Sequence, residues 1–307
     1  MNRRQRRVNL IKNLIIWTIV LVQLFSITAV VILSVSVFRL NKKIDELSTY
    51  EVSQPTSLSE EAASLDKAQI TTVQSSYADE PINEEGSIAV ASATESLAQS
   101  EDIPVVYLTF DDGPSPNSNK ILDILDDYGI KATFFVVGRE DDTSANIYRR
   151  IVDEGHTLGM HSYTHIYSKL YASEDSFTSD LNRIHDLLLD RTGVDCKLYR
   201  FPGGSSNHVS NVDVHKLINI LDERGIRYYD WNAANRDATG VTYTADELVE
   251  NVISNVVEYK TTVVLMHDVS GKETTVESLP KLIEELQAMG VVILPITDST
   301  PLIQHDL

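Results

Sequence analysis

The stretch VVYLTFDDGP, residues 105–114, sets the fold that we expect for this chain. Its first six residues favour a β-strand, and the Asp-Gly-Pro sequence that follows favours a turn. Two adjacent carboxylates, Asp111 and Asp112, therefore lie where the strand ends. Because adjacent side chains point in different directions, one carboxylate can face a metal ion while the other faces a substrate.

Strand-like runs recur along the rest of the chain and alternate with amphipathic, helix-like stretches. The expected strands are 105–110, 131–137, 157–160, 197–201, 226–231, 262–266 and 291–295, and the expected helices are 119–128, 176–191, 213–224, 244–257 and 274–289. Such alternation implies right-handed crossovers and a parallel sheet. About seven repeats predict an α/β fold, a distorted (β/α) barrel, with an open doubly wound sheet as the alternative.

Chemically capable side chains follow the expected strands at their carboxyl ends. Besides the two aspartates after the first strand, they are His161 and His165 after the third, Arg200 at the end of the fourth, Asp237 past the fifth and His267 directly after the sixth. In a parallel α/β barrel the carboxyl ends of all strands open onto one face. Segments far apart in the sequence are therefore expected to form one pocket.

The histidine pair His161 and His165 has a spacing typical of metal ligands. Four residues apart on a helical turn, two side chains lie on the same face, within reach of one ion. Two imidazoles and one carboxylate give three protein ligands and leave one position for water, which is the pattern of a catalytic zinc site. A chance pair of surface histidines is the alternative.

Arg200 and His267 complete the candidate site. Arg200 precedes a Pro-Gly-Gly segment, so a fixed cation for a carboxylate lies beside backbone N–H groups that can meet an oxyanion. A surface arginine before a turn is the alternative. His267 follows an apolar run at a strand end, where a lone histidine is more often structural than catalytic. Its position opposite the other motifs favours a catalytic role.

Taken together, these residues resemble the polysaccharide deacetylase family, which is carbohydrate esterase family 4 or the NodB homology domain, over about 104–300. Residues 109–114 resemble the first motif of the family, and 161–165 resemble its His-Ser/Thr-x-x-His motif. Residues 200–202 resemble its Arg-x-Pro motif, and 265–267 its Leu-x-His motif. Four such motifs in the right order are a specific signal.

The resemblance implies a role for each matched residue. Asp111 is the expected general base, oriented by Arg200, and His267 is the expected general acid. The backbone N–H of Gly203 is expected to line an oxyanion hole. The resemblance also implies one divalent metal ion, Zn²⁺ with Co²⁺ or Mn²⁺ as alternatives, held by Asp112, His161 and His165.

The fourth motif departs from the family pattern, which often has Asp-x-x-Asp-Trp at this point. Residues 231–238 have the sequence WNAANRDA, so Asp237 matches the carboxylate that steadies the catalytic histidine. Ala238 stands in place of the family's aromatic residue, and Asp230 is the alternative carboxylate. The wall of the substrate pocket is expected to include Trp231 and Leu265.

The N-terminal part of the chain differs in composition from the rest. Residues 13–38 contain no charged side chain, and as a helix of about 39 Å they can cross a hydrocarbon core of about 30 Å. The basic flanks predict a single-pass cell-membrane anchor, with residues 1–12 cytoplasmic and the catalytic domain, 104–307, extracellular. A cleaved signal peptide is the alternative. Residues 39–103 are acidic and poor in aromatics, which predicts a flexible spacer.

Charge and cysteine content narrow the possible functions. The net charge of −19 argues against a nucleic-acid partner, and the single cysteine, Cys196, excludes an intramolecular disulfide.

The expected function is metal-dependent removal of N-acetyl groups from an extracellular cell-wall glycan, with peptidoglycan N-acetylglucosamine as the first candidate. The alternatives are an O-acetyl esterase, a catalytically silent membrane-tethered glycan-binding module, and a non-enzymatic scaffold acting through the spacer.

Overall fold

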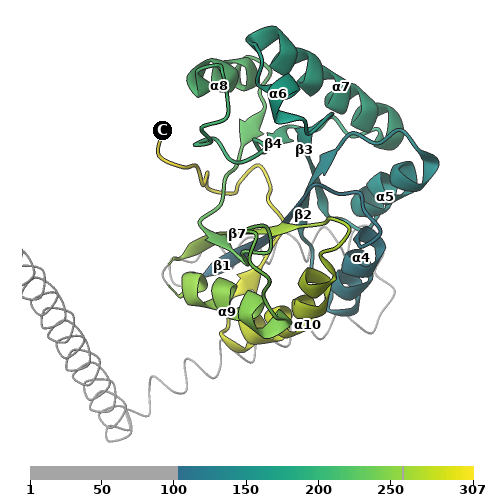
Figure 1. The fold of residues 1–307 in the computed structure, drawn as a ribbon. Helices are drawn as coiled ribbons and strands as arrows, with labels where there is room; N and C mark the ends of the chain where they lie inside the picture. Colours follow the sequence, from purple (N-terminus) through teal and green to yellow (C-terminus); the bar gives the residue numbers. More distant parts are fainter. Residues whose placement is uncertain (1–102, 258) are drawn as a thin grey trace, which may run out of the picture. The chain divides into compact units, whose positions relative to one another are not determined.

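The computed structural model describes residues 103–257 and 259–307, which form an α/β domain (Figure 1). The predicted membrane anchor, 13–38, and all but the last residue of the predicted spacer, 39–103, lie outside the described residues. Within the described ranges, no helix is both long enough and apolar enough to span a bilayer.

Parallel strands form one curled sheet in this domain. The strands are β1 (Val105–Asp111), β2 (Thr133–Val137), β3 (Thr157–Ser162), β4 (Leu198–Tyr199), β5 (Arg227–Tyr228), β6 (Ala233–Ala234), β7 (Thr261–His267) and β8 (Val292–Ile293). Their order is β5-β4-β3-β2-β1-β7-β6, and every pairing is parallel. β2 pairs with the last three residues of β1, and β8 pairs with its first two. Strand β1 therefore lies at the centre of the sheet.

The predicted α/β architecture of parallel strands is confirmed, and the distorted barrel takes the form of a half-barrel. Among the described residues no ladder joins β5 to β6, the two ends of the sheet. β5 is shorter than the expected strand 226–231 because the Asp230 N–H donates to the carbonyl of Ile303, in the C-terminal segment, and not to a strand. The two-residue strand β6 is absent from the sequence-based prediction.

Helices flank the sheet (Figure 1). They are α4 (Ser118–Asp127), α5 (Asp142–Asp153), α6 (Tyr167–Leu170), α7 (Glu174–Thr192), α8 (Val214–Asp222), α9 (Ala245–Val256) and α10 (Glu273–Ala288). The sequence predicts all of these except α5 and α6. The signals for α5 are present, since Asp141 caps its first turn and Tyr148 and Ile151 lie on its buried face. Helix α6 is one turn long, too short for a periodic pattern to be seen.

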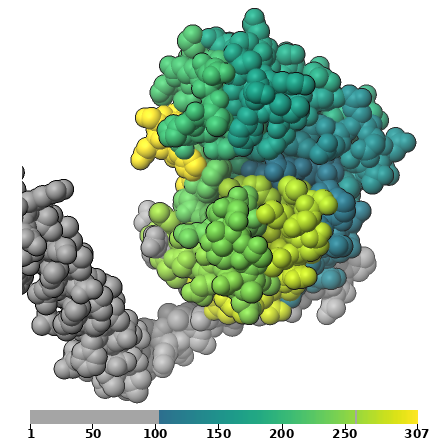
Figure 2. Space-filling model, viewed as in Figure 1, coloured from purple at the N-terminus to yellow at the C-terminus, as the bar shows by residue number. Residues whose placement is uncertain are grey.

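The sheet is buried on both faces, which fixes the position of its carboxyl edge. Along β1, Val106 and Leu108 pack into the larger hydrophobic cluster, while Val105 and Tyr107 pack into a smaller one. Burial of each such side chain contributes on the order of 2 kcal/mol. Beyond that edge, the surface is hollowed between the residues of α6–α8 and those of α9–α10 (Figure 2).

Candidate active site

The carboxyl edge of the sheet brings the predicted site residues together. Asp111 and His267 are the last residues of β1 and β7, and they are direct partners in the ladder between these strands. His161 lies in β3, one residue before its end, and Arg200 directly follows β4. The neighbouring strands β1 and β7, strand β3 on the far side of β2, and the exit of β4 thus carry the candidate chemistry.

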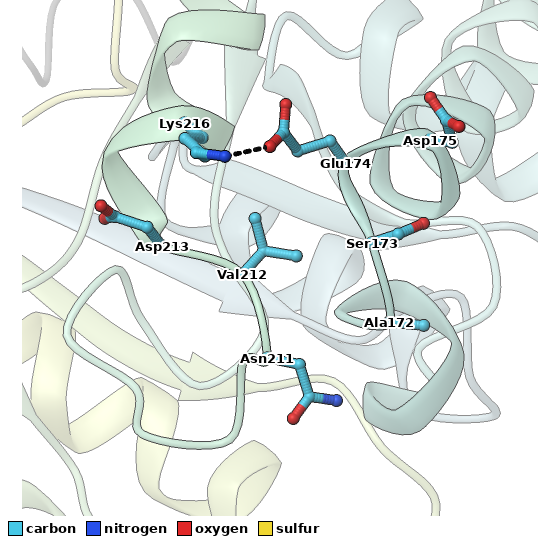
Figure 3. Close-up of a pocket in the computed structure, with 8 residues that line it drawn as sticks. All are labelled: Ala172, Ser173, Glu174, Asp175, Asn211, Val212, Asp213 and Lys216. Carbon is cyan, nitrogen blue, oxygen red and sulfur yellow. Dashed lines mark hydrogen bonds and ion pairs between the residues drawn. The ribbon is translucent and has the colours of Figure 1, made fainter.

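A separate hollow of about 550 Å³ lies between the start of α7 and the start of α8 (Figure 3). Glu174 and Lys216 form an ion pair of 2.7 Å across it. None of the predicted site residues lines this hollow. The candidate site is therefore identified by the chemistry of its side chains and not by the size of a cavity.

Asp112, His161 and His165 form a cluster that fits a divalent metal ion. Each offers one ligand atom, and these atoms lie within 4.8 Å of one another. Asp112 Oδ1 is 3.4 Å from His161 Nε2 and 3.1 Å from His165 Nε2. It is buried and has no hydrogen-bond partner in the part of the chain that the structure describes. A buried oxygen without a donor is uncommon in proteins, and two imidazole nitrogens beside it complete the donor set of a metal site.

The orientation and the protonation state of the His161 ring also suit a metal ligand. Its Nδ1 lies 2.7 Å from the Arg200 carbonyl oxygen, which leaves Nε2 directed at the cluster. A backbone partner of this kind orients metal-binding imidazoles. Burial lowers the pKa of His161 to about 3. The ring is therefore neutral at physiological pH, in the form that binds a metal.

Two of the three ligands have left-handed backbone conformations. Asp112 has φ of 74° and His165 has φ of 50°. Non-glycine residues rarely adopt this region, and such strain of about 1–3 kcal/mol is concentrated at functional sites. Here it turns the two side chains back towards His161.

The sequence predicts that His161 and His165 converge because they lie on one face of a helical turn, and this reason is wrong. His161 lies in a strand and His165 in the loop after it, so the two are not on a helical turn. The buried carboxylate of Asp180, on α7, holds this loop. It accepts hydrogen bonds from the N–H groups of Tyr163 and Thr164, at 2.7 and 3.0 Å, and from the hydroxyls of Ser162 and Thr164, both at 2.8 Å.

Replacement of Asp180 by Ala is expected to weaken Zn²⁺ binding about 10- to 100-fold, the usual effect of losing an outer partner of a metal ligand. Two backbone N–H groups would lose their acceptor, and the loop would no longer hold His165 in place. Calorimetric titration with Zn²⁺ measures the change. Asp190→Ala, an exposed position on the same helix, is the matched control, and equal affinity in both variants would contradict this role.

Arg200 holds Asp111 in a buried ion pair. The guanidinium is fully buried and donates to Asp111 Oδ1 at 2.9 Å and to Thr109 Oγ1 at 2.6 Å. It also donates to the carbonyls of Tyr229 and Asp230. Burial raises the pKa of Asp111 above its ordinary value, although Arg200 and His267 oppose the rise. A carboxylate of raised pKa accepts a proton more readily, as a general base requires.

His267 and Asp237 form a second pair. His267 Nδ1 lies 2.7 Å from Asp237 Oδ1, while Asp237 Oδ2 accepts from the His267 N–H and from the Thr275 hydroxyl. Burial disfavours the charged imidazolium, but the hydrogen bond and charge of Asp237 outweigh it and raise the pKa of His267. Burial also opposes ionisation of Asp237, yet its bond from His267 lowers the pKa of Asp237. The alternative carboxylate, Asp230, instead accepts from Ser205 and His305.

Two of the predicted pocket residues, Leu265 and Trp231, lie beside these pairs. Leu265 precedes His267 by two residues on β7, so both side chains point to the same face of the sheet. The ring of Trp231 lies 5.9 Å from the Arg200 guanidinium carbon. Gly203 is exposed and has a left-handed φ of 80°. Ala238 is exposed.

The sequence prediction omits several residues that support the site. Asp180 lies on the apolar stripe of α7 beside Phe177 and Leu181, and a carboxylate at such a position is a signal that the sequence contains. Thr275 is buried on α10 in the same way. Nothing local in the sequence singles out Thr109, since its partner Arg200 is distant along the chain.

The comparisons with known proteins agree with this geometry. The family model described as polysaccharide deacetylase matches residues 98–227. The catalytic domain of a peptidoglycan N-acetylglucosamine deacetylase from Eubacterium rectale superposes with a TM-score of 0.64 and 38% identity, covering 67% of this chain and 94% of that domain. The chain belongs to the polysaccharide deacetylase family. This family of hydrolases is also called CE4, and its model ends before Asp237 and His267, whose pairing is seen in the structure.

Curated relatives in the family carry different names. A peptidoglycan-N-acetylglucosamine deacetylase of Bacillus cereus is 31% identical over 190 residues, which are 61% of this chain and 67% of that protein. A bifunctional xylanase/deacetylase of Pseudobutyrivibrio xylanivorans is 31% identical over 196 residues, which are 63% of this chain and 30% of that protein. The chain thus spans less than a third of the length of the xylanase/deacetylase, and family membership leaves the substrate open.

Proposed function

We propose that this domain hydrolyses N-acetyl groups of an amino-sugar polymer and releases acetate. One observation carries the proposal: the Asp112, His161 and His165 cluster lies next to a carboxylate–guanidinium pair and to a histidine–carboxylate pair. Amide hydrolysis requires a polarised carbonyl, a base for the attacking water and an acid for the departing nitrogen. The three groups of side chains meet these three requirements.

The residues of this chain have distinct tasks in the proposed reaction. Asp112, His161 and His165 would hold a divalent ion, which would supply Lewis acidity for the attacking water and the acyl group. Asp111, held by Arg200, takes a proton from the attacking water. The Gly203 N–H donates a hydrogen bond to the acyl oxygen as negative charge develops there. His267, kept protonated by Asp237, gives its proton to the nitrogen, and an amine and acetate leave.

Peptidoglycan N-acetylglucosamine is the substrate that we favour. The support is the likeness to deacetylases of that name in Eubacterium rectale and Bacillus cereus. The proposed anchor, 13–38, and spacer, 39–103, would carry the domain outside the cell membrane, where the cell wall lies. This location rests on the sequence pattern alone.

Acetate release tests the proposal. The Zn²⁺-loaded protein is incubated with oligosaccharides of N-acetylglucosamine, with peptidoglycan fragments, and with O-acetylated xylan. We expect acetate and new free amines from the first two, and faster release from the peptidoglycan fragments. Acetate from the O-acetylated xylan alone would favour the esterase instead, and acetate from none would favour a silent glycan-binding module.

The rate of acetate release is expected to depend on pH through the titration of Asp111 and of His267. Asp111 must be ionised and His267 protonated, so activity falls as pH drops through the pKa of Asp111 and as it rises through that of His267. Because Asp237 raises the pKa of His267, Asp237→Asn should move the alkaline limb of kcat/KM to lower pH. Initial rates across pH give this limb, and an unchanged limb would show that His267 is not the titrating acid.

A further inference from the structure

Tyr167 lies between the metal cluster and the proposed oxyanion hole, and the mechanism above assigns it no task. It is half-buried at the start of α6, two residues after His165. Its ring packs edge-on against His165, at 5.5 Å between centroids, and against Tyr171, at 6.0 Å. The charges of Asp112 and Asp111 act on its phenol. Its hydroxyl makes no hydrogen bond within 103–257 and 259–307.

The ring of Tyr167 is fixed relative to the loop that contains Gly203. The buried hydroxyl of Tyr171, which follows α6, donates to the carbonyl oxygen of Pro202 at 2.9 Å. Asn207 donates to the Gly204 carbonyl oxygen at 2.8 Å and closes the same loop from the other side. The distance between Tyr167 and Gly203 is therefore set by a buried hydrogen bond and not by free rotation of exposed side chains.

Gly203 leaves just enough room for this hydroxyl. A Cβ atom placed on Gly203 would lie 3.2 Å from Tyr167 Oη, closer than most real contacts of a Cβ, and 3.6 Å from Tyr167 Cε2. The hydroxyl therefore lies close to Gly203, which is exposed, while Tyr167 is half-buried. Among the described residues this hydroxyl is a donor without a partner, next to a backbone N–H proposed to meet negative charge.

We propose that Tyr167 is a further catalytic residue, whose hydroxyl donates a hydrogen bond to the substrate's acyl oxygen as that oxygen becomes negatively charged. This inference rests on the deacetylation proposed above. Tyr167 and Gly203 would then form a two-donor oxyanion hole, one donor from a side chain and one from the backbone. No bond is made or broken at Tyr167, which keeps its proton throughout.

Tyr167→Phe tests the role, because it removes the hydroxyl and leaves the ring against His165 and Tyr171. Loss of one oxyanion donor typically costs 10²- to 10³-fold in kcat. We expect kcat for acetate release from an N-acetylglucosamine oligosaccharide to fall about 10²-fold, with KM and Zn²⁺ affinity within about twofold. Tyr128→Phe, which removes an exposed phenol hydroxyl bonded to Glu284, is the matched control and should keep the wild-type kcat. A Tyr167→Phe variant with wild-type kcat would overturn the proposal.

A second pair of variants separates chemistry from packing. Gly203→Ala places its methyl group against the Tyr167 hydroxyl, so it should cost more kcat in the wild-type background than in Tyr167→Phe. Independent effects that simply add would contradict direct contact between these two positions.

Binding of a tetrahedral analogue distinguishes this inference from the proposed function. A methylphosphonamidate of glucosamine carries the negative oxygens of the reaction's tetrahedral stage. We expect Tyr167→Phe to bind it about tenfold more weakly than the wild type. If the wild type binds the analogue in this Tyr167-dependent way but releases no acetate, the proposed function fails and the hydrogen bond stands. Equal binding by both proteins would overturn the inference whatever the turnover.

Discussion

Asp111→Asn is expected to lower kcat for acetate release on the order of 10³-fold while the domain keeps its metal. The amide has the shape of the carboxylate and can still accept from Arg200, but it cannot take a proton from water, and a positioned base contributes about 10²- to 10⁴-fold. Asp111 is 2% exposed and lies 2.9 Å from Arg200, so its carboxylate is held in one place at the site.

The stability of Asp111→Asn must be measured beside its activity. Arg200 is fully buried, and removal of its negative partner leaves a buried charge without compensation, a change that destabilises proteins by about 3–5 kcal/mol. We therefore expect a lower thermal midpoint, and rates should be taken well below it. Zn²⁺ content by mass spectrometry should equal that of the wild type. A folded, metal-loaded variant with full activity would exclude Asp111 as the base.

His165→Ala is expected to remove the metal and, with it, the activity. His165 supplies one of three protein ligands, and its side chain is one-third exposed, so its loss should leave the core intact. Zn²⁺ affinity should fall by more than about 10²-fold, since loss of even an outer partner of a ligand costs 10- to 100-fold. Acetate release should fall in parallel and recover in part at high Zn²⁺ concentration.

His185→Ala is the control for this experiment. His185 lies on α7 and pairs with Asp195 at 2.8 Å, apart from the cluster. The His185→Ala variant should keep both its metal and its activity. If His165→Ala lost its metal but retained wild-type turnover, the cluster would have no part in the reaction.

The sequence is informative about the site because its residues follow strand ends. Asp111, His267 and Arg200 can be grouped without a structure, since carboxyl ends of parallel strands meet at one edge. The pairing of Asp237 with His267 is implied only by the resemblance to the family's fourth motif, which leaves Asp230 as an alternative, and the structure selects Asp237. The left-handed backbone of Asp112 cannot be seen in this way, because aspartate seldom adopts that conformation and no local pattern specifies it.

Contacts between distant segments account for what the sequence does not predict. The place of Asp180 on the apolar stripe of α7 signals a buried carboxylate, but its partners, in the loop of Tyr163 and Thr164, are known only once that loop is placed against the helix. The barrel stays open in part because the segment around Ile303 bonds to Asp230, a pairing of residues more than 70 positions apart. Tyr167 approaches Gly203 only once α6 packs against the loop after β4. Each of these is a property of tertiary packing, which local patterns do not encode.

Removal and return of the metal tests the central claim most directly. The purified protein is stripped with a chelator, dialysed, and titrated with Zn²⁺ while acetate release from N-acetylglucosamine oligosaccharides is followed. We expect no release from the stripped protein, a linear recovery that ends at one ion per chain, and no recovery in His165→Ala at that concentration. Undiminished release by a stripped protein shown to contain no metal would contradict the account.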